Sequence, residues 1–181
     1  IGDSTLNKNI ASNNIALGYQ ALNSNINGTD NISLGYQSLL KNLSASNNIA
    51  FGNGALNQNI GGGSNFAAGF STLINNTYGS DNTAIGYGAL NQNTLGSRNV
   101  SVGGFSLQNN TIGNDNTAIG YAALNRNTNG TDNIAIGSQS LYYNLSASNN
   151  IAFGNGALNK NIGGGNNFAA GFSTLYTNTY G

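Results

Sequence analysis

The sequence has no cysteine, histidine, methionine, tryptophan, proline or glutamate, and it has few charged residues of either sign. Without cysteine the chain forms neither disulfides nor thiolate metal sites, an absence that says nothing about its compartment. Five basic and five acidic residues leave a net charge of zero, so there is no electrostatic signature of binding to nucleic acid or to anionic membranes. No apolar run approaches the roughly 20 residues that a membrane span needs.

The sequence has few residues of the types that usually carry out catalysis. General acid–base catalysis usually employs His, Glu, or a tuned Asp or Lys, and of these only Asp and Lys are present. We therefore expect no enzyme activity, no catalytic residues and no cofactor. The sequence shows no signal peptide and begins with Ile1, so we also expect it to be an excerpt of a longer chain.

What the sequence does contain is one short phrase, repeated along its whole length. A glycine that ends this phrase recurs every 17 residues without slippage, and we call it the anchor glycine. The anchor glycines are Gly18, Gly35, Gly52, Gly69, Gly86, Gly103, Gly120, Gly137, Gly154 and Gly171. A fixed short period of this kind is typical of stacked-coil proteins, so we predict a single repeat array over residues 1–181.

Before each anchor the pattern alternates apolar, small and apolar residues, which is the period of a β-strand. A glycine at every anchor would cost a helix about 1 kcal/mol each time. The fold class that we predict is all-β: a parallel β-solenoid, or β-roll, of about ten 17-residue coils. Each coil is expected to have a short strand around NTAIG, a second strand around GAL, and a turn through NxxG.

Two further columns keep the same register, and we expect both to be structural ladders in which each residue stacks on its own copy. Identical amides can hydrogen-bond along a stack, because asparagine carries both a donor and an acceptor. A second asparagine, from Asn14 to Asn167, also lies four residues before each anchor. The leucines, four residues after each anchor, are Leu22, Leu39, Leu56, Leu73, Leu90, Leu107, Leu124, Leu141, Leu158 and Leu175. The asparagines, seven residues after each anchor, are Asn25, Asn42, Asn59, Asn76, Asn93, Asn110, Asn127, Asn144, Asn161 and Asn178.

The few charges also obey the register. Asp30, Asp81, Asp115 and Asp132 share one turn position, and Arg98 occupies that position between Asp81 and Asp115. Stacking is expected to sandwich Arg98 between these two carboxylates. Asp115 and Asp132 would lie on adjacent coils, and they are the weak candidates for a Ca²⁺ site, because hard cations take clustered oxygen ligands. We predict no other metal site.

The sequence also contains a longer repeat. Residues 42–79 are nearly repeated by residues 144–181, an offset of 102 residues or six coils. Such a block duplication lengthens a rod, and ten coils spaced by about 4.8 Å would measure about 48 Å. Because neither end of the array shows a cap, we expect either further coils beyond these residues or self-association into a head-to-tail filament.

The phrases NTAIGYGAL, NTAIGYAAL and NIAIGSQSL resemble the repeats of trimeric autotransporter adhesin heads and the NTAIGYxAL repeats of phage tail-fibre-like proteins. This resemblance implies a parallel β-roll, often a homo-oligomer in the form of a homotrimeric rod, located outside the cell, on a cell surface or on a virion surface. The function that we predict is a structural segment of an extracellular fibre or filament, acting as a stiff spacer.

Two alternatives stay open. The first is an adhesin module that binds a glycan or another surface, since aromatic residues such as Tyr19, Tyr87 and Tyr121 follow the anchors. Packing of these rings along the stack or between chains is the competing interpretation. The second alternative, which the sequence favours less, is an ice-binding solenoid. Its threonine column would lie eight residues after the anchors, where Thr77 and Thr94 alternate with residues such as Ile26 and Leu145.

Overall fold

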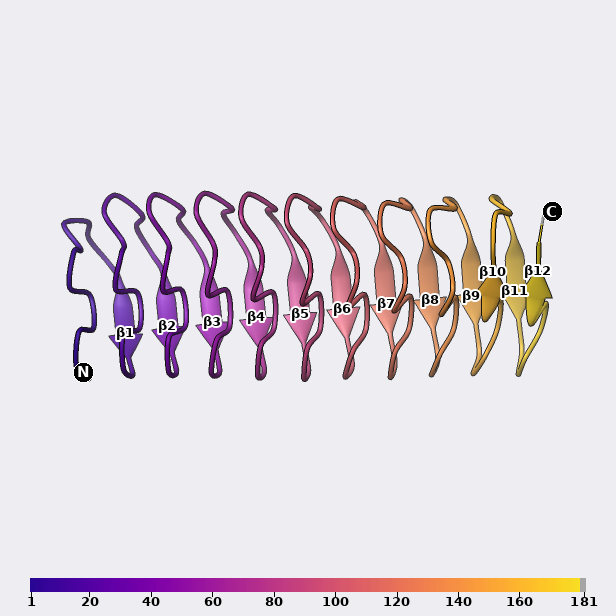
Figure 1. Ribbon diagram of the computed structural model, residues 1–181, viewed down its shortest axis with the longest axis horizontal. Helices are drawn as coiled ribbons and strands as arrows, with labels where there is room; N and C mark the ends of the chain where they lie inside the picture. The colour runs from indigo at the N-terminus through magenta and orange to yellow at the C-terminus, as the bar shows by residue number, and fades with distance from the viewer. Residues whose placement is uncertain (180–181) are drawn as a thin grey trace.

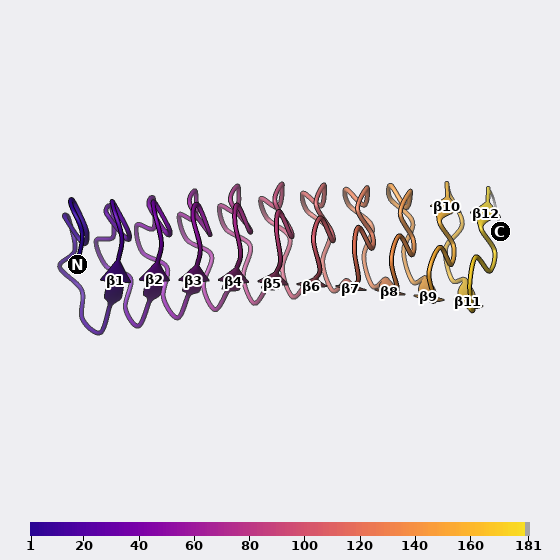
Figure 2. The same cartoon turned by 90° about the horizontal axis from the view of Figure 1, so that it is seen from below.

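The computed structural model describes residues 1–179, and in it the chain winds into a rod of stacked coils (Figure 1). Each coil contributes one three-residue strand to a single ten-stranded parallel sheet, whose order follows the sequence. Figure 2 shows this sheet along one side of the rod, with the short strands β10 and β12 on the other side. The strands are β1 (Ile15–Leu17), β2 (Ile32–Leu34), β3 (Ile49–Phe51), β4 (Phe66–Ala68), β5 (Thr83–Ile85), β6 (Val100–Val102), β7 (Thr117–Ile119), β8 (Ile134–Ile136), β9 (Ile151–Phe153), β10 (Lys160–Asn161), β11 (Phe168–Ala170) and β12 (Thr177–Asn178).

Every strand pairs with its neighbour at an offset of 17 residues, so that Ala84 lies opposite Ser101 and Ile85 opposite Val102. The same register holds along the whole sheet. The predicted fold class, an all-β parallel solenoid of about ten coils, is therefore confirmed. No helix in residues 1–179 is long and apolar enough to cross a membrane.

The interior of the rod is narrow and is filled by small residues of the strands and by the leucines. The middle residue of each strand, always Ala or Ser, points inward and is buried. It lies close to the small residue on the facing wall, as the contact of 2.6 Å between the Ser33 and Ser38 hydroxyl oxygens demonstrates. An interior this thin has no room for Ile or Phe from the strands, so the flanking apolar residues point outward.

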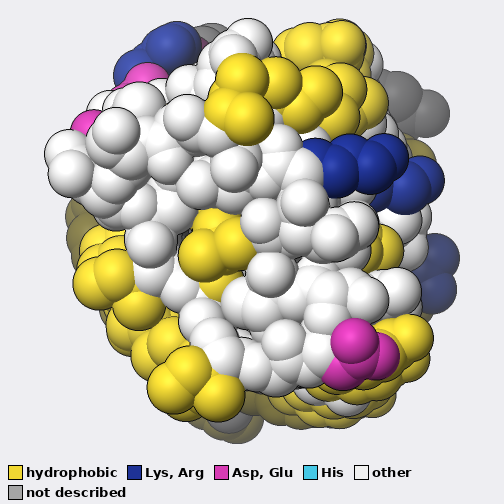
Figure 3. Space-filling model, turned by 90° about the vertical axis from the view of Figure 1, so that its left-hand side faces the viewer, with side chains coloured by type: hydrophobic (Ala, Val, Ile, Leu, Met, Phe, Trp, Pro, Cys, Tyr) yellow, Lys and Arg dark blue, Asp and Glu magenta, His cyan; other side chains and the backbone are white. Residues whose placement is uncertain are grey.

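The flanking residues of the strands consequently form an apolar outer face on the rod. Ile85 and Phe153 are both 39% exposed, and Ile15 at the first strand is 57% exposed. Viewed along the rod axis, hydrophobic side chains occupy the rim of the molecule as well as its centre (Figure 3). Soluble chains seldom expose a continuous apolar stripe of this length without a partner for it.

The expected second strand around GAL is wrong. In this segment the residues two and four positions after the anchor both have positive φ, for example Gly88 at +62° and Leu90 at +50°. Strand pairing requires extended backbone, and a left-handed leucine costs about 1–2 kcal/mol, so propensity alone gives no sign of this conformation. The backbone N–H groups still bond between coils: Gly88 donates to the Phe70 carbonyl of the preceding coil and Leu90 to the Ser106 carbonyl of the following one.

The left-handed conformation turns the leucine side chains into the rod. Each of them from Leu22 to Leu158 is fully buried, and together with the inward alanines they form one continuous hydrophobic core. Leu175, in the last coil of the described residues, is 49% exposed. Burying one such side chain contributes roughly 1.5–3 kcal/mol, which offsets the strain of its backbone.

The anchor glycines make the corner between the sheet and the left-handed segment. Gly103 has φ +131°, and a Cβ added there would lie 2.5 Å from the carbonyl oxygen of Gly120 in the next coil. Both the backbone conformation and the close approach of adjacent coils therefore demand glycine at this corner.

Candidate functional site

The most regular feature of the molecule is a ladder of buried asparagines, seven residues after each anchor, which we call the trailing ladder. Each Nδ2 donates to the Oδ1 of the asparagine one coil earlier, at 2.7–3.1 Å from Asn42 to Asn178. From Asn25 to Asn161 the Nδ2 also donates to a carbonyl three residues later in its own turn, as Asn93 does to Gly96 at 2.8 Å. The predicted asparagine ladder is confirmed, and each amide bridges two coils while closing its own turn.

A second ladder, which we call the leading ladder, runs through the asparagines four residues before each anchor. Here each Oδ1 accepts two hydrogen bonds from the next coil: Asn82 Oδ1 accepts the backbone N–H of Asn99 at 3.0 Å and its Nδ2 at 3.1 Å. Asn99 Nδ2 also donates to the Gly113 carbonyl at 2.9 Å. Asn48 Nδ2 is an exception, with no hydrogen-bond partner among the described residues.

In most turns the two ladders meet at one carbonyl; the turns of Gly62 and Gly164 are exceptions, where only the trailing-ladder bond is present. The Gly96 carbonyl accepts from Asn93 of the trailing ladder at 2.8 Å and from Asn82 of the leading ladder at 2.9 Å. Both of its lone pairs are therefore used, in a place where water has no access. An unpaired buried amide costs about 1–3 kcal/mol, so each coil is stable only when its neighbours supply these partners.

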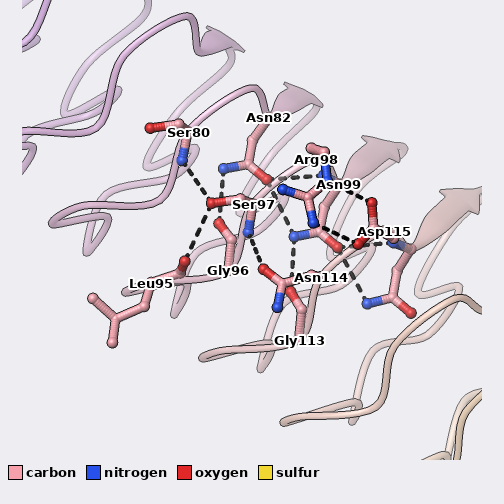
Figure 4. A network of polar contacts seen from close by, with 11 residues as sticks. Ser80, Asn82, Leu95, Gly96, Ser97, Arg98, Asn99, Gly113, Asn114 and Asp115 are labelled. Atoms are coloured by element: carbon pink, nitrogen blue, oxygen red, sulfur yellow. Dashed lines mark hydrogen bonds and ion pairs between the residues drawn. The ribbon is translucent and has the colours of Figure 1, made fainter.

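A third ladder, which sequence reasoning missed, crosses the turn beside Gly96 (Figure 4). The Ser80 backbone N–H donates to Ser97 Oγ at 3.0 Å, and the Ser97 N–H donates to Asn114 Oδ1 at 2.8 Å. The signal was present in the sequence, because Ser, Thr or Asn recurs at this turn position wherever glycine does not. These side chains satisfy turn N–H groups that no strand partner reaches.

The charged residues that share one turn position do not all pair as predicted. We call this set, Asp30, Asp81, Arg98, Asp115 and Asp132, the charged column. Arg98 makes a bidentate ion pair with Asp115, with Nε–Oδ1 at 2.7 Å and Nη2–Oδ2 at 2.8 Å (Figure 4). Hydrogen bonding from Arg98 lowers the pKa of the Asp115 carboxyl below its ordinary value. This pair is the one salt bridge found within residues 1–179, so the expected sandwich with Asp81 is wrong. A planar guanidinium satisfies one carboxylate with both donors on the same side, which leaves Asp81 without an equivalent bond.

The Arg98–Asp115 ion pair also affects the candidate Ca²⁺ site at Asp115 and Asp132. Both Asp115 oxygens accept hydrogen bonds from Arg98, so the chain's own cation already occupies this carboxylate. In the part of the chain that the structure describes, no three acidic, histidine or cysteine side chains come together as metal ligands would. Asp132 is exposed on the adjacent coil.

The aromatic residues after the anchors pack along the stack. The rings of Tyr19 and Tyr36 stack at a centroid distance of 5.2 Å, and those of Phe70 and Tyr87 at 5.3 Å. Tyr87, Phe105 and Tyr121 continue the row edge to face. Because these rings, apart from that of Phe105, stay about half exposed, they also form an aromatic strip on the surface of the rod.

The threonine column is regular over four coils only. The hydroxyls of Thr77, Thr94, Thr111 and Thr128 each donate to the carbonyl of the equivalent residue one coil later, at 2.8–3.0 Å. Their donor protons are thus used by the backbone, and large apolar residues such as Ile60 and Leu145 flank the row on either side. An ice-binding surface would have to be built from the methyl groups and the remaining acceptor sites.

Within residues 1–179 these contacts form hydrogen-bonded ladders that run along the rod. Comparisons with models of protein families, with curated proteins and with solved structures find no match. The likeness to adhesin-head and tail-fibre repeats therefore stays a prediction from the NTAIG phrases, and the function has to be argued from the ladders and the surface of this chain.

Proposed function

We propose that this chain is a structural segment of an extracellular fibre or filament, which acts as a stiff spacer. The observation that carries the proposal is the trailing ladder, which links each coil to the preceding one from Asn42 to Asn178. A rod in which every coil makes the same bonds can be lengthened by adding coils, without any change in cross-section.

The near-repetition of residues 42–77 six coils later supports this interpretation. Residues 42–77 and 144–179 adopt the same ladder contacts 102 residues apart, as the bonds Asn59–Asn42 and Asn161–Asn144 illustrate. A chain whose role is to span a distance gains length from such a duplication. A binding site or an active site, by contrast, requires a particular local arrangement.

The spacer proposal is tested by inserting a third block. Inserting a further copy of residues 42–143 between residues 143 and 144 keeps the 17-residue register. Small-angle X-ray scattering should show a rod longer by about 29 Å, six coils at about 4.8 Å, with an unchanged radius of gyration of the cross-section. A compact particle, or a rod of unchanged length, would count against a spacer.

We further propose that copies of the chain associate side by side through the apolar outer face of the sheet. The face extends along all ten strands of the sheet, and a second copy offers a stripe of the same length and the same repeat. The resemblance to adhesin heads makes a parallel homotrimer the first candidate. The outward residues of the stripe include Ile15, Leu17, Phe51, Ile85, Ile119, Phe153 and Phe168, each more than a third exposed.

Light scattering of the purified chain measures this association. We expect a mass of about three chains, and we expect the double variant Ile85→Lys/Ile119→Lys to be monomeric with an unchanged circular dichroism spectrum. Gln92→Lys, which adds a charge on a different side of the coil, is the matched control and should keep the oligomer. A monodisperse monomer for the unmodified chain would refute association but would leave the spacer proposal intact.

A further inference from the structure

Residues 37–77 and residues 139–179, which lie six coils apart, are two copies that differ in a small number of places, and most of these places lie together on the surface. Aligned with residues 37–77, residues 139–179 carry six substitutions. Five of them fall in two neighbouring columns, five and six residues after the anchor, and the sixth is Ser64 against Asn166 in a turn. The five pairs are Leu40 and Tyr142, Lys41 and Tyr143, Gln58 and Lys160, Ile74 and Tyr176, and Asn75 and Thr177.

Exposure alone does not explain this concentration. Other exposed side chains of the block are identical in both copies, among them Leu43 and Leu145, and Phe51 and Phe153. The two copies therefore share the outer apolar face and, apart from Ser64 and Asn166, the turns, and they differ in one strip that is rich in tyrosine in the second copy. We call Tyr142, Tyr143, Lys160 and Tyr176 the tyrosine patch.

The patch is an ordered arrangement of rings and cations. The rings of Tyr142 and Tyr143 meet edge to face with centroids 4.7 Å apart. The Arg126 guanidinium lies 5.1 Å from the centroid of the Tyr143 ring, and the Lys160 ammonium lies 5.8 Å from that of Tyr176. Such cation–π contacts hold the two long side chains over the rings instead of leaving them free in solvent.

Between these rings lies an open hollow of about 290 Å³, lined by the patch together with the amides of Gln139 and Asn159. A second hollow of about 240 Å³ shares Gln139 and Tyr142, and continues toward the Phe105 and Tyr121 rings. The two hollows together form a shallow trough whose walls are aromatic rings and whose polar groups are amides. Polar surface predominates in the first hollow, which suits a ligand rich in hydroxyl groups.

Lys160 gives the trough a positive charge, and Arg126 lies beside the trough, over the Tyr143 ring. Within the described residues neither Arg126 nor Lys160 forms a salt bridge, because the one such bridge joins Arg98 to Asp115. The aspartates of the charged column lie in the turn, six residues further along the coil than these two cations. A ligand with a carboxylate would find a charge partner here.

We propose that the tyrosine patch is a binding site for an acidic saccharide. Tyrosine rings stack against the C–H faces of sugar rings, the Gln139 amide can bond hydroxyls, and Lys160, which lines the hollow, can pair with the sugar carboxylate, while Arg126 holds the Tyr143 ring. The first copy, which has Leu40, Lys41, Gln58 and Ile74 in these positions and Ser24 in place of Arg126, lacks the site. This inference does not depend on the spacer proposal, since a rod can carry a site or be without one.

The duplication supplies the variants that test the site. Replacing the patch by the residues of the first copy, as Tyr142→Leu/Tyr143→Lys/Lys160→Gln/Tyr176→Ile, uses side chains that already fit the same coil positions. The reverse change, Ser24→Arg/Leu40→Tyr/Lys41→Tyr/Gln58→Lys/Ile74→Tyr, builds a second patch. Circular dichroism confirms that each variant folds.

The assay begins with an array of uronic-acid and sialic-acid oligosaccharides beside their neutral counterparts, followed by calorimetry with the best acidic probe. We expect the unmodified chain to bind one probe per chain and to prefer it over its neutral counterpart. The first-copy variant should bind at least about tenfold more weakly, and the reverse variant should bind two probes per chain. No binding to any acidic probe, equal binding of the neutral counterpart, or unchanged binding by the first-copy variant would overturn the proposal.

Discussion

Replacing Asn93 by alanine tests how much one step of the trailing ladder contributes to stability. Asn93 lies in the middle of the array and its side chain is fully buried. Its Nδ2 donates to Asn76 Oδ1 and to the Gly96 carbonyl, both at 2.8 Å, and its Oδ1 accepts from Asn110 at 2.9 Å. The substitution removes all three hydrogen bonds at once.

The expected magnitude follows from these contacts. A typical intramolecular hydrogen bond contributes about 0.5–1.5 kcal/mol net, and the Asn76 oxygen loses its ladder donor in a place closed to water. The neighbours are partly protected, because Gly96 still accepts from Asn82 and Asn110 still donates to Gly113. We therefore expect Asn93→Ala to lower the free energy of unfolding by roughly 2–4 kcal/mol.

Urea denaturation followed by circular dichroism measures this change. Gln92→Ala is the matched control, since Gln92 is the exposed neighbour of Asn93, and its effect should stay within about 0.5 kcal/mol. If Asn93→Ala moved the unfolding midpoint no further than the control does, the ladder would contribute nothing, and the reasoning that coils depend on their neighbours' amides would fail.

Three further predictions concern the corner, the core and the charges. Gly103→Ala should prevent stable folding, because Gly103 has a positive φ and the new Cβ would lie 2.5 Å from the carbonyl oxygen of Gly120. Gly104→Ala should fold, because the nearest heavy atom to its new Cβ is 3.7 Å away. Soluble expression and thermal melts compare the two variants. Leu90→Ala should lower the free energy of unfolding, measured by urea denaturation, by about 2–5 kcal/mol, because Leu90 is buried. Leu95→Ala should lower it by less than about 0.5 kcal/mol, because Leu95 is exposed. Equal effects would mean that the leucine column does not form the core. Because its arginine partner lowers the folded-state pKa of Asp115, that pair stabilises the fold above about pH 4 and the contribution is lost as the pH falls through the lowered pKa. Melts between pH 2 and pH 8 should therefore show a loss only at acid pH, smaller in Asp115→Asn, and a variant as acid-sensitive as the parent would contradict this role.

Much of the fold could be predicted because the sequence repeats it ten times. The 17-residue register follows from the anchor glycines alone, and it assigns every ladder partner, such as Asn76 to Asn93. The parallel sheet follows as well, since stacked identical coils can pair only in parallel. These features depend on the 17-residue period, which is constant from Gly18 to Gly171.

The conformation within one coil could not be predicted in the same way. The alternation around Ile134 and Ile136 indicates a strand but does not say which side faces in, and Ala135 turns out to fill the thin interior. Leu141 has φ +49°, a conformation that its intrinsic preference disfavours and that only the packing of neighbouring coils stabilises. The tyrosine patch was missed as well, because its residues come together across coils and stand out only when the two blocks are compared.

The stacking of residues 17 positions apart is the claim on which everything else depends, and disulfide mapping tests it most directly. The chain has no cysteine of its own. Asn75 and Gln92 are one coil apart with their side-chain amides in contact at 3.1 Å, so cysteines at these two positions should form an intramolecular disulfide under mild oxidation. Cysteines at positions 75 and 109, two coils or about 9.6 Å apart, should not. Failure of the first pair to close, or equal closure of the second, would contradict the solenoid.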